Sequence, residues 1–117
     1  MTTPVGPYTP IVRAGDWLIA AGQIGLSDGA VVEGGVAAEL RQAIANLAGL
    51  LERQGASLAD VAKTTLFLTD IDDYALVNEV YVDCFGDHRP ARSAVAVAAL
   101  PVGARVEIEA WAHVPGS

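Results

Sequence analysis

Arg92 and Glu109 are the residues of this sequence whose types and spacing best suit chemistry on a small carboxylate. Arg92 stands at the entrance to the apolar segment 91–98, and Glu109 lies within the alternating segment 105–113. A guanidinium is a planar fork that matches a carboxylate, and a glutamate can position and activate water or shuttle a proton. The pair therefore predicts a site for a small carboxylate, with a structural ion pair as the alternative.

The pairing of the two segments decides whether these side chains meet. If the segments form a hairpin through the turn 101–103, the numbers of facing residues have a constant sum. An odd sum places Arg92 and Glu109 on one face of the sheet, either directly opposite at about 5 Å or diagonal at about 7–8 Å. An even sum places them on opposite faces, and the spacing alone leaves both arrangements open.

The other residues with chemical potential fit structural roles better. The acidic cluster 70–73 lacks the glycine and the distal glutamate of an EF-hand loop and is typical of a helix start. The glycine-rich stretch 22–29 lacks the spacing of a dinucleotide-binding loop. His88 and His113 are isolated histidines, and Cys84 falls on the apolar stripe of a helix, where a thiol is generally buried and inert. The sequence therefore predicts no metal site and no dinucleotide site.

Hydrophobic periodicity predicts two helices that help to position these residues. Apolar residues recur at helical spacing from Val36 to Leu51, and Gly55 supplies the stop. The polar residues Glu39, Gln42, Asn46 and Arg53 are expected away from this stripe. A second helix is expected from the acidic cluster 70–73 to about Phe85, because acidic groups are favourable at the positive end of a helix dipole.

Short apolar or alternating segments predict the strands. These segments are 10–14, 17–21, 61–68, 91–98 and 105–113. The first two flank Gly15-Asp16 and are typical of a hairpin. The segment 91–98 is apolar on both faces, like a fully buried strand. The order ββαβαββ predicts an α/β (α+β) fold in which a mixed sheet carries both helices on one face.

Composition predicts a single domain over residues 1–117. The chain is 52% hydrophobic and 18% charged, which is rich enough in apolar residues for a packed core. Aromatic residues make up only 6%, because much of the apolar fraction is alanine. Small side chains fill a core thinly, so we expect this short chain to bury surface against copies of itself.

Charge and chain termini limit the classes of partner. The net charge of −7 disfavours binding to nucleic acid and to anionic membranes. No apolar run approaches the roughly 18 residues of a membrane span, and the N-terminus lacks the segments of a signal peptide. The single cysteine excludes an internal disulfide. We therefore expect a cytoplasmic protein with no nucleic-acid or membrane partner.

Short motifs in order and at compatible spacing resemble those of the RidA/YjgF family, the reactive intermediate (imine/enamine) deaminases. They are Gly6-Pro7-Tyr8, Ala21-Gly22-Gln23-Ile24, Val61-Ala62-Lys63-Thr64-Thr65-Leu66-Phe67, Val77-Asn78-Glu79-Val80-Tyr81, and the C-terminal signature Pro90-Ala91-Arg92-Ser93 with Val106-Glu107-Ile108-Glu109. The resemblance covers most of the chain. It implies a chorismate-mutase-like α/β domain that forms a homotrimer, with ligand sites in the clefts between subunits.

The resemblance also implies an activity and roles for residues. Members of the family hydrolyse 2-imino acids, or their enamine tautomers, to 2-keto acids and ammonia without a cofactor. By the motif match, Arg92 clamps the substrate carboxylate and Glu109 positions and activates the hydrolytic water. Gly22 brings a backbone group close to the ligand. Tyr8 forms part of the cleft wall, and Asn78 lies near the site.

The sequence departs from the family pattern near the expected cleft. Many members have a cysteine two residues after the arginine, where this chain has Ala94, and Arg89 stands where an apolar residue is common. The loop before Pro90 is also shorter than in the best-known deaminases. These differences leave an alternative function open, a non-enzymatic trimer that binds small carboxylates and regulates or chaperones a partner. Ribonuclease activity, reported for some relatives, fits poorly with a net charge of −7.

Overall fold

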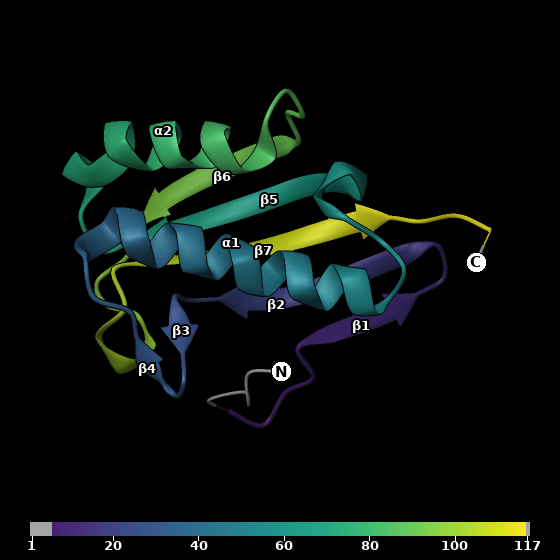
Figure 1. The fold of residues 1–117 in the computed structure, drawn as a ribbon, viewed down its shortest axis with the longest axis horizontal. Coiled ribbons are helices and arrows are strands. Elements are labelled where there is room, and N and C mark those ends of the chain that lie inside the picture. Colours follow the sequence, from purple (N-terminus) through teal and green to yellow (C-terminus); the bar gives the residue numbers. More distant parts are fainter. Residues whose placement is uncertain (1–5, 117) are drawn as a thin grey trace.

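The structure is a computed structural model that describes residues 6–116 as a five-stranded mixed sheet with two helices on one face (Figure 1). The strands of the sheet are β1 Ile11–Ala14, β2 Trp17–Gln23, β5 Val61–Leu68, β6 Ala91–Ala96 and β7 Val106–His113. The helices are α1 Gly35–Arg53 and α2 Tyr74–Phe85. A separate small hairpin joins β3 Leu26–Ser27 to β4 Ala30–Val31. The expected fold class is confirmed, and so is the placement of both helices on one face.

The strand order is β1-β2-β7-β5-β6. β1 and β2 form the expected hairpin, in which Ile11 pairs with Ala20 and Ala14 with Trp17. The turn between them uses Gly15 at a φ of 60°, a left-handed conformation that glycine adopts without a steric cost. β2 then pairs with β7, so the hairpin extends one side of the sheet.

The last two strands do not pair, so the expected hairpin between them is wrong. β5 lies between them, parallel to β6 and antiparallel to β7. β5, α2 and β6 form a parallel crossover unit, which places β6 on one side of β5 and leaves the other side free. β7 takes that free side, because the segment 97–105 is long enough to cross the roughly 10 Å of two strand spacings.

β6 is an edge strand with exposed side chains, so the expectation of a strand buried on both faces is also wrong. Val95 is 43% exposed, and most residues of the strand are exposed or half-buried. α2 covers one face of this strand. Within residues 6–116, nothing pairs with its outer edge. The apolar composition of β6 is therefore not explained by packing within one chain.

α1 buries the expected apolar stripe against the sheet, with Leu40, Leu47 and Leu51 at its centre. Glu39 is an exception to the expected pattern, because its side chain is buried and not on the polar side of the helix. Its Oε1 accepts a hydrogen bond from the backbone N–H of Arg105 at 2.8 Å, and its Oε2 accepts one from Arg105 Nη1 at 2.7 Å. A buried carboxylate is tolerated here because both oxygens are bonded to donors.

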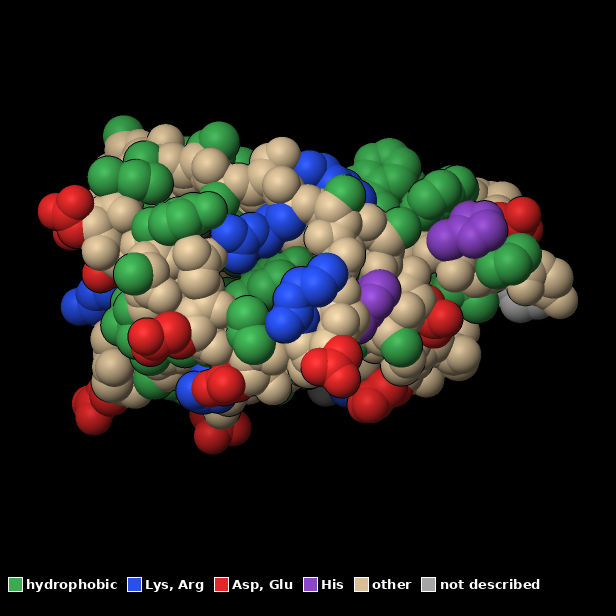
Figure 2. All heavy atoms as spheres, turned by 90° about the horizontal axis from the view of Figure 1, so that it is seen from above, with side chains coloured by type: hydrophobic (Ala, Val, Ile, Leu, Met, Phe, Trp, Pro, Cys, Tyr) green, Lys and Arg blue, Asp and Glu red, His purple; other side chains and the backbone are tan. Residues whose placement is uncertain are grey.

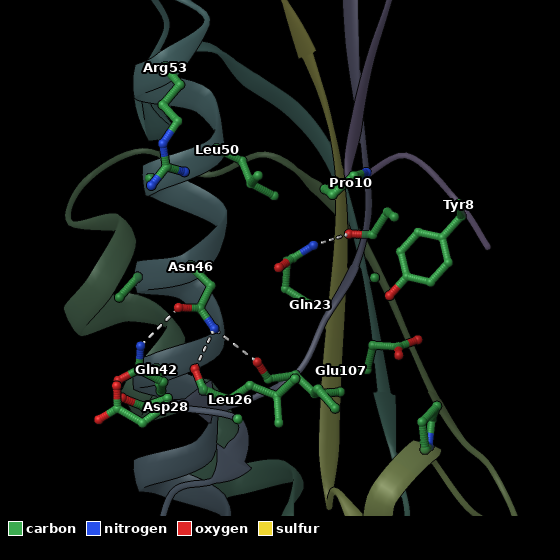
Figure 3. Close-up of a pocket in the computed structure, with 18 residues that line it drawn as sticks. Tyr8, Pro10, Gln23, Leu26, Asp28, Gln42, Asn46, Leu50, Arg53 and Glu107 are labelled. Atoms are coloured by element: carbon green, nitrogen blue, oxygen red, sulfur yellow. Dashed lines mark hydrogen bonds between the residues drawn. The ribbon is translucent and has the colours of Figure 1, made fainter. Parts of the chain in front are cut away.

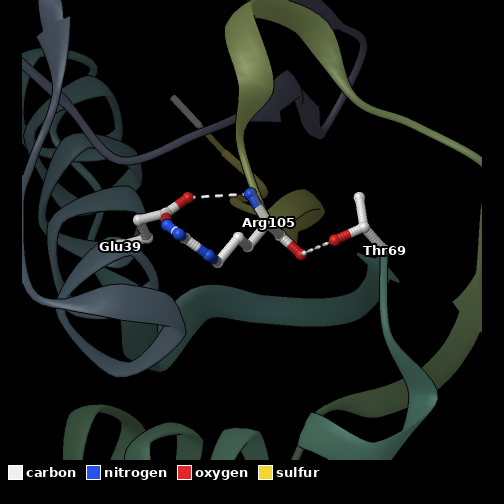
Figure 4. Close-up of polar contacts among 3 residues, drawn as sticks. All are labelled: Glu39, Thr69 and Arg105. Carbon is white, nitrogen blue, oxygen red and sulfur yellow. Dashed lines mark hydrogen bonds and ion pairs between the residues drawn. The ribbon is translucent and has the colours of Figure 1, made fainter.

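Glu39 thereby attaches α1 to the start of β7 (Figure 4). The carbonyl of Arg105 accepts a hydrogen bond from the backbone N–H of Thr69 at 3.1 Å, just beyond the end of β5. One residue thus receives contacts from α1 and from the chain after β5. The position of β7 along the sheet is fixed at this junction.

The acidic cluster 70–73 begins a helix, as expected. Asp70 accepts a hydrogen bond from the backbone N–H of Asp72 at 2.9 Å and caps the short 3₁₀ turn Ile71–Asp73, which leads into α2. Within residues 6–116, no group of three or more His, Cys, Asp or Glu side chains is placed to hold a metal ion. In the same residues, no helix is both long and apolar enough to cross a membrane.

Candidate active site

A pocket of about 850 Å³ opens where β2 continues past Ile11, the first residue of β1 (Figure 3). We call it the β2 pocket. Its walls come from the N-terminal segment through Tyr8, from β2 through Gly22, from α1 through Asn46 and from β7 through Glu107. Figure 3 shows α1 with Asn46 on one side of β2, and Tyr8 and Glu107 on the other. The pocket therefore wraps around the end of β2 and reaches both sides of the sheet.

An irregularity in β2 brings Glu107 against the backbone. The pairing of β2 with β7 shifts register between Ala20 and Gln23, so the strand carries one extra residue there. A Cβ added to Gly22 would stand 2.6 Å from Cδ of Glu107, closer than real Cβ atoms approach. Only glycine leaves the carboxyl group this room. The resemblance implies that a ligand comes close to Gly22, and the structure shows that the side chain of Glu107 does so.

The environment of Glu107 favours its neutral form. The side chain is half-buried, and burial together with the nearby charge of Glu109 raises the pKa of the Glu107 carboxyl above its usual range. A carboxyl group with a raised pKa exchanges protons closer to neutral pH, which suits general acid–base chemistry. Glu109 lies on the same face of β7, opposite Thr65 of β5, and does not line the pocket.

Amide side chains hold the α1 side of the pocket. Asn46 donates from Nδ2 to the carbonyls of Ile24 at 3.2 Å and Leu26 at 3.0 Å, and its Oδ1 accepts from Gln42 Nε2 at 2.9 Å. These bonds attach the chain after β2 to the helix and fix the width of the pocket. The sequence pattern places Gln42 and Asn46 on the polar side of α1 and predicts no role for them in the site. Their spacing of four residues was the only signal that they could interact.

Arg92 lies in a second group of side chains between β6 and α2, which we call the Arg92 cluster. Its Nη2 donates to Asn78 Oδ1 at 2.8 Å and to the hydroxyl of Tyr74 at 3.1 Å. The guanidinium carbon lies 4.9 Å from the ring centroid of Tyr81 and 5.6 Å from that of Tyr74, which is cation–π distance. The structure therefore brings two expected site residues, Arg92 and Asn78, into direct contact.

Tyr81 forms the floor of this cluster. Its hydroxyl is hydrogen-bonded at 2.8 Å to Oγ1 of Thr64, a fully buried residue of β5 that pairs with Arg92. Burial raises the pKa of the Tyr81 hydroxyl, while the hydrogen bond with Thr64 and the charges of Arg92 and Arg89 act against that rise. The guanidinium of Arg92 is thus supported from below by a ring that is itself fixed to the sheet.

The expected site residues fall into two groups on opposite faces of the sheet. Arg92 shares the helix-covered face with Thr64. Glu107 and Glu109 point to the other face, since they alternate with the buried residues Val106, Ile108 and Ala110. Tyr8 and Gly22 line the β2 pocket together with Glu107. Within one chain, Arg92 and the two glutamates therefore do not form a common site.

The cysteine and the histidines lie in structural positions. Cys84 is half-buried beside the core, and burial raises the pKa of its thiol, which leaves little reactive thiolate. His88 contacts the carbonyl of Val61 at 2.7 Å. The ring of His113 lies 4.9 Å from that of Trp17 at the other end of the sheet.

This geometry defines a small α+β protein with a half-buried carboxyl group on one sheet face and an arginine on the other. Comparisons with known proteins identify the family of this protein. A family model described as Endoribonuclease L-PSP matches residues 1–114. A RutC family protein of Pyrococcus horikoshii is 44% identical over 112 residues, which are 94% of this chain and 89% of that protein. The 2-iminobutanoate/2-iminopropanoate deaminase of Homo sapiens is 46% identical over 110 residues, which are 92% of this chain and 80% of that protein.

The solved structures agree. The crystal structure of RidA from the Antarctic bacterium Psychrobacter sp. superposes with a TM-score of 0.92 at 38% identity, covering 96% of this chain and 92% of that one. A putative endoribonuclease from Thermotoga maritima gives a TM-score of 0.90 at 45% identity, covering 96% of this chain and 90% of that one. The chain belongs to the RidA/YjgF family.

Proposed function

We propose that this protein is a deaminase that hydrolyses small 2-imino acids, or their enamine tautomers, to 2-keto acids and ammonia. The observation that carries the proposal is the Glu107 carboxyl, half-buried with a raised pKa and held against Gly22 in an open pocket. The mammalian relatives named 2-iminobutanoate/2-iminopropanoate deaminase support the reaction class.

For this reaction the protein needs only to orient the substrate and the water and to transfer protons. An iminium carbon is already electrophilic, so a positioned base is sufficient to activate water against it. Glu107 takes a proton from water as the water oxygen bonds to the imine carbon. The same carboxyl returns that proton to the nitrogen. As the carbon–nitrogen bond breaks and ammonia leaves, the carboxylate accepts the proton of the new hydroxyl group, so the carbonyl of the keto acid forms and the proton brought in by the iminium passes to solvent. Water is the only co-reactant.

In this proposal Glu107 has the water-activating role that the family resemblance implied for Glu109. Glu109 does not line the β2 pocket, whereas Glu107 does. The charge of Glu109 contributes to the raised pKa of Glu107. Glu109 therefore acts on the base from two residues away, and Tyr8 and Gly22 shape the pocket around it.

We assign the substrate carboxylate to Arg92 of a second copy of the chain. Arg92 uses one nitrogen, Nη2, to bond Asn78 and Tyr74, and within residues 6–116 its remaining N–H groups are left for a ligand. A second copy is supported by apolar surface that one chain leaves uncovered, including Val95 of β6 and Trp111 of β7 at 43% and 42% exposed. The resemblance to the family supports a homotrimer as that assembly.

The reaction is tested by generating 2-iminopropanoate and 2-iminobutanoate in situ with an amino-acid oxidase. The decay of the imine is followed by its competition with semicarbazide. The protein is expected to accelerate hydrolysis over buffer, and the absence of any acceleration would overturn the proposal. Keto-acid binding without turnover would select the non-enzymatic carboxylate-binding trimer, which is favoured by Ala94 in place of a thiol two residues after Arg92.

The composite site is tested with two inactive variants. Arg92→Gln and Glu107→Gln are each expected to lower kcat/KM by at least about 100-fold, the usual effect of losing a positioned acid–base or binding group. Co-expression of the two variants gives mixed oligomers in which about a quarter of the sites join an intact Arg92 to an intact Glu107. Recovery of activity in the mixture supports a site shared between subunits. Mixed oligomers that stay inactive would show that both residues must come from one chain.

A further inference from the structure

Two guanidinium groups share the face formed by α2, β6 and the loop between them. Figure 2 looks onto this side of the molecule and shows basic side chains gathered beside a hydrophobic hollow. Arg92 lies over the ring of Tyr81, and Arg89 lies three residues earlier, in the loop between α2 and β6. The charges of both arginines act to lower the pKa of the Tyr81 hydroxyl. The two arginines are therefore neighbours around one aromatic side chain.

Neither arginine has an acidic partner among residues 6–116. The ion pairs of that part of the chain join Arg41 to Asp83 and Arg105 to Glu39. The chain has seven Lys and Arg against fourteen Asp and Glu, so carboxylates are plentiful. Two like charges placed together without a carboxylate repel one another, and a ligand with two negative charges relieves that repulsion.

The loop holds the Arg89 side chain in a defined place. Nη1 of Arg89 donates to the carbonyls of Gly86 and His88. His88 Nε2 lies 2.7 Å from the carbonyl of Val61, and since a carbonyl oxygen only accepts, this nitrogen carries the proton. The loop is thereby attached to the start of β5. In the part of the chain that the structure describes, the remaining N–H groups of Arg89 are left for a ligand.

We propose that Arg89 selects 2-imino acids with a second carboxylate. Arg92 binds the carboxylate next to the imine, and Arg89 binds the carboxylate at the far end of the substrate. The inference rests on the proposed function, because it assigns the side-chain end of the same substrate. The reaction is unchanged: water adds to the imine carbon and ammonia leaves.

Charge and shape favour a carboxylate over a phosphate at Arg89. One guanidinium balances one carboxylate and presents two parallel N–H groups to its two oxygens. A phosphate carries close to two charges at neutral pH, so one would remain unbalanced in a protein of net charge −7. The pair of arginines therefore matches a dicarboxylate.

Arg89 also contacts the carbonyl of Gly86, which caps the C-terminus of α2, and a purely structural role would consist of that contact alone. Loss of a helix cap lowers stability and affects every ligand to the same degree. Loss of a carboxylate-binding group changes the preference between ligands. The ratio of affinities for a dicarboxylate and a monocarboxylate separates the two roles.

The experiment measures binding of keto-acid products by calorimetry, on the assembled wild-type protein and its variants. The probes are 2-oxoglutarate and oxaloacetate, which have two carboxylates of different spacing, and 2-oxobutanoate, which has one. Arg89→Gln is expected to weaken the preferred dicarboxylate about tenfold and to change 2-oxobutanoate less than about twofold. Arg89→Lys keeps the charge and is expected to retain part of the preference.

Arg13→Gln is the matched control, because Arg13 is exposed and also donates to backbone carbonyls, yet lies on β1. It is expected to leave all three affinities unchanged. Equal weakening of all three probes by Arg89→Gln would overturn the inference in favour of a structural cap. Tighter binding of a 2-oxo acid with a distal phosphonate than of 2-oxoglutarate would overturn the choice of a carboxylate.

Turnover separates this inference from the proposed function. Wild type that hydrolyses 2-iminobutanoate, without preferring an imine with a second carboxylate, contradicts the role of Arg89 and leaves the deaminase intact. Wild type that binds 2-oxoglutarate through Arg89 but hydrolyses no imine contradicts the deaminase. In that case the dicarboxylate site stands as a binding site.

Discussion

The β2 pocket and the Arg92 cluster use the two faces of one sheet in opposite ways. In the pocket, an acid lies against backbone because Gly22 has no side chain and β2 has an extra residue. In the cluster, the guanidinium cation of Arg92 lies on aromatic rings and is held by the hydrogen bonds that it donates to side chains of α2. The pocket depends on the absence of a side chain at Gly22. The cluster depends on the aromatic rings and polar side chains that contact Arg92. Adding atoms should therefore damage the first, and removing atoms the second.

Each region is also anchored by one buried polar contact. Glu39 bonds Arg105, two residues before Glu107 in the chain, and so fixes the entry to β7. Thr64 bonds the hydroxyl of Tyr81 beneath Arg92. The contact under the pocket carries a charge and joins backbone, whereas the contact under the cluster is neutral. We expect the charged contact to be worth more.

The largest effect is expected from Gly22→Ala. The new Cβ would stand 2.6 Å from Cδ of Glu107, so the carboxyl group must move away from the backbone. A displacement of about 1 Å at a reacting group costs on the order of 100-fold in rate. We expect kcat/KM for 2-iminobutanoate to fall by about that factor, measured by the semicarbazide assay.

Gly49→Ala is the control for this variant, since Gly49 lines the same pocket on α1 and its nearest neighbour would be 3.8 Å from the new Cβ. Alanine is also the better helix former, so this variant should keep its activity and its fold. Full activity of Gly22→Ala would mean that the position of Glu107 against the backbone does not matter for turnover.

A smaller effect, on stability, is expected from Glu39→Ala. The change leaves the backbone N–H of Arg105 without its buried acceptor and opens space beside the core. We expect the free energy of unfolding to fall by about 2 kcal/mol, measured by urea denaturation. Glu52→Ala, at an exposed position of the same helix, should change it by less than about 0.5 kcal/mol. Similar values for both variants would show that the contact between Glu39 and Arg105 does not stabilise the fold.

Local patterns were sufficient to predict the elements, because each is set by its own residues. The alternation at 105–113 places Glu107 and Glu109 on one face, and the structure confirms it. Alternation cannot say which of the two lies against β2, because that depends on the extra residue between Ala20 and Gln23. Local patterns could not predict which strands pair either. The position of β7 beside β5 follows from the α2 crossover and not from chain order. Glu39 was misplaced for the same reason, because its partner Arg105 is distant in sequence.

Removing one oxygen tests the anchor of the cluster. Tyr81→Phe leaves the Thr64 hydroxyl buried without its partner, so we expect a loss of about 1 kcal/mol in the free energy of unfolding. The ring that supports Arg92 remains, so keto-acid affinity should change less than about twofold. Tyr74→Phe removes an exposed hydroxyl and should leave stability nearly unchanged. A large loss of keto-acid affinity in Tyr81→Phe would show that the hydroxyl itself takes part in binding.

The smallest effect is expected from Glu109→Gln, and it reports on the charge of the pocket. Burial first, and then the charge of Glu109, raises the pKa of Glu107, so removing that charge lowers this pKa while burial still holds it above its usual range. Glu107 then stays ionised to lower pH, and the acid limb of kcat/KM should move to lower pH by about half a unit or less. Glu79→Gln, at an exposed position of α2, should not move it.

Glu109→Gln should also change how the free energy of unfolding depends on pH, in a direction that follows from the pKa of Glu107. A carboxyl whose pKa is raised on folding contributes stability that is present below its unfolded pKa, about 4.3, and lost as pH rises through the folded pKa. Glu109→Gln lowers the folded pKa of Glu107, so the protein should lose less stability on ionisation of this group. From pH 4 to pH 7, the free energy of unfolding should therefore change slightly more favourably in the variant than in wild type. The difference should be well under 1 kcal/mol, because Glu107 keeps contact with solvent. An acid limb that does not move, together with stability that does, would mean that Glu107 titrates as described but is not the base of the reaction.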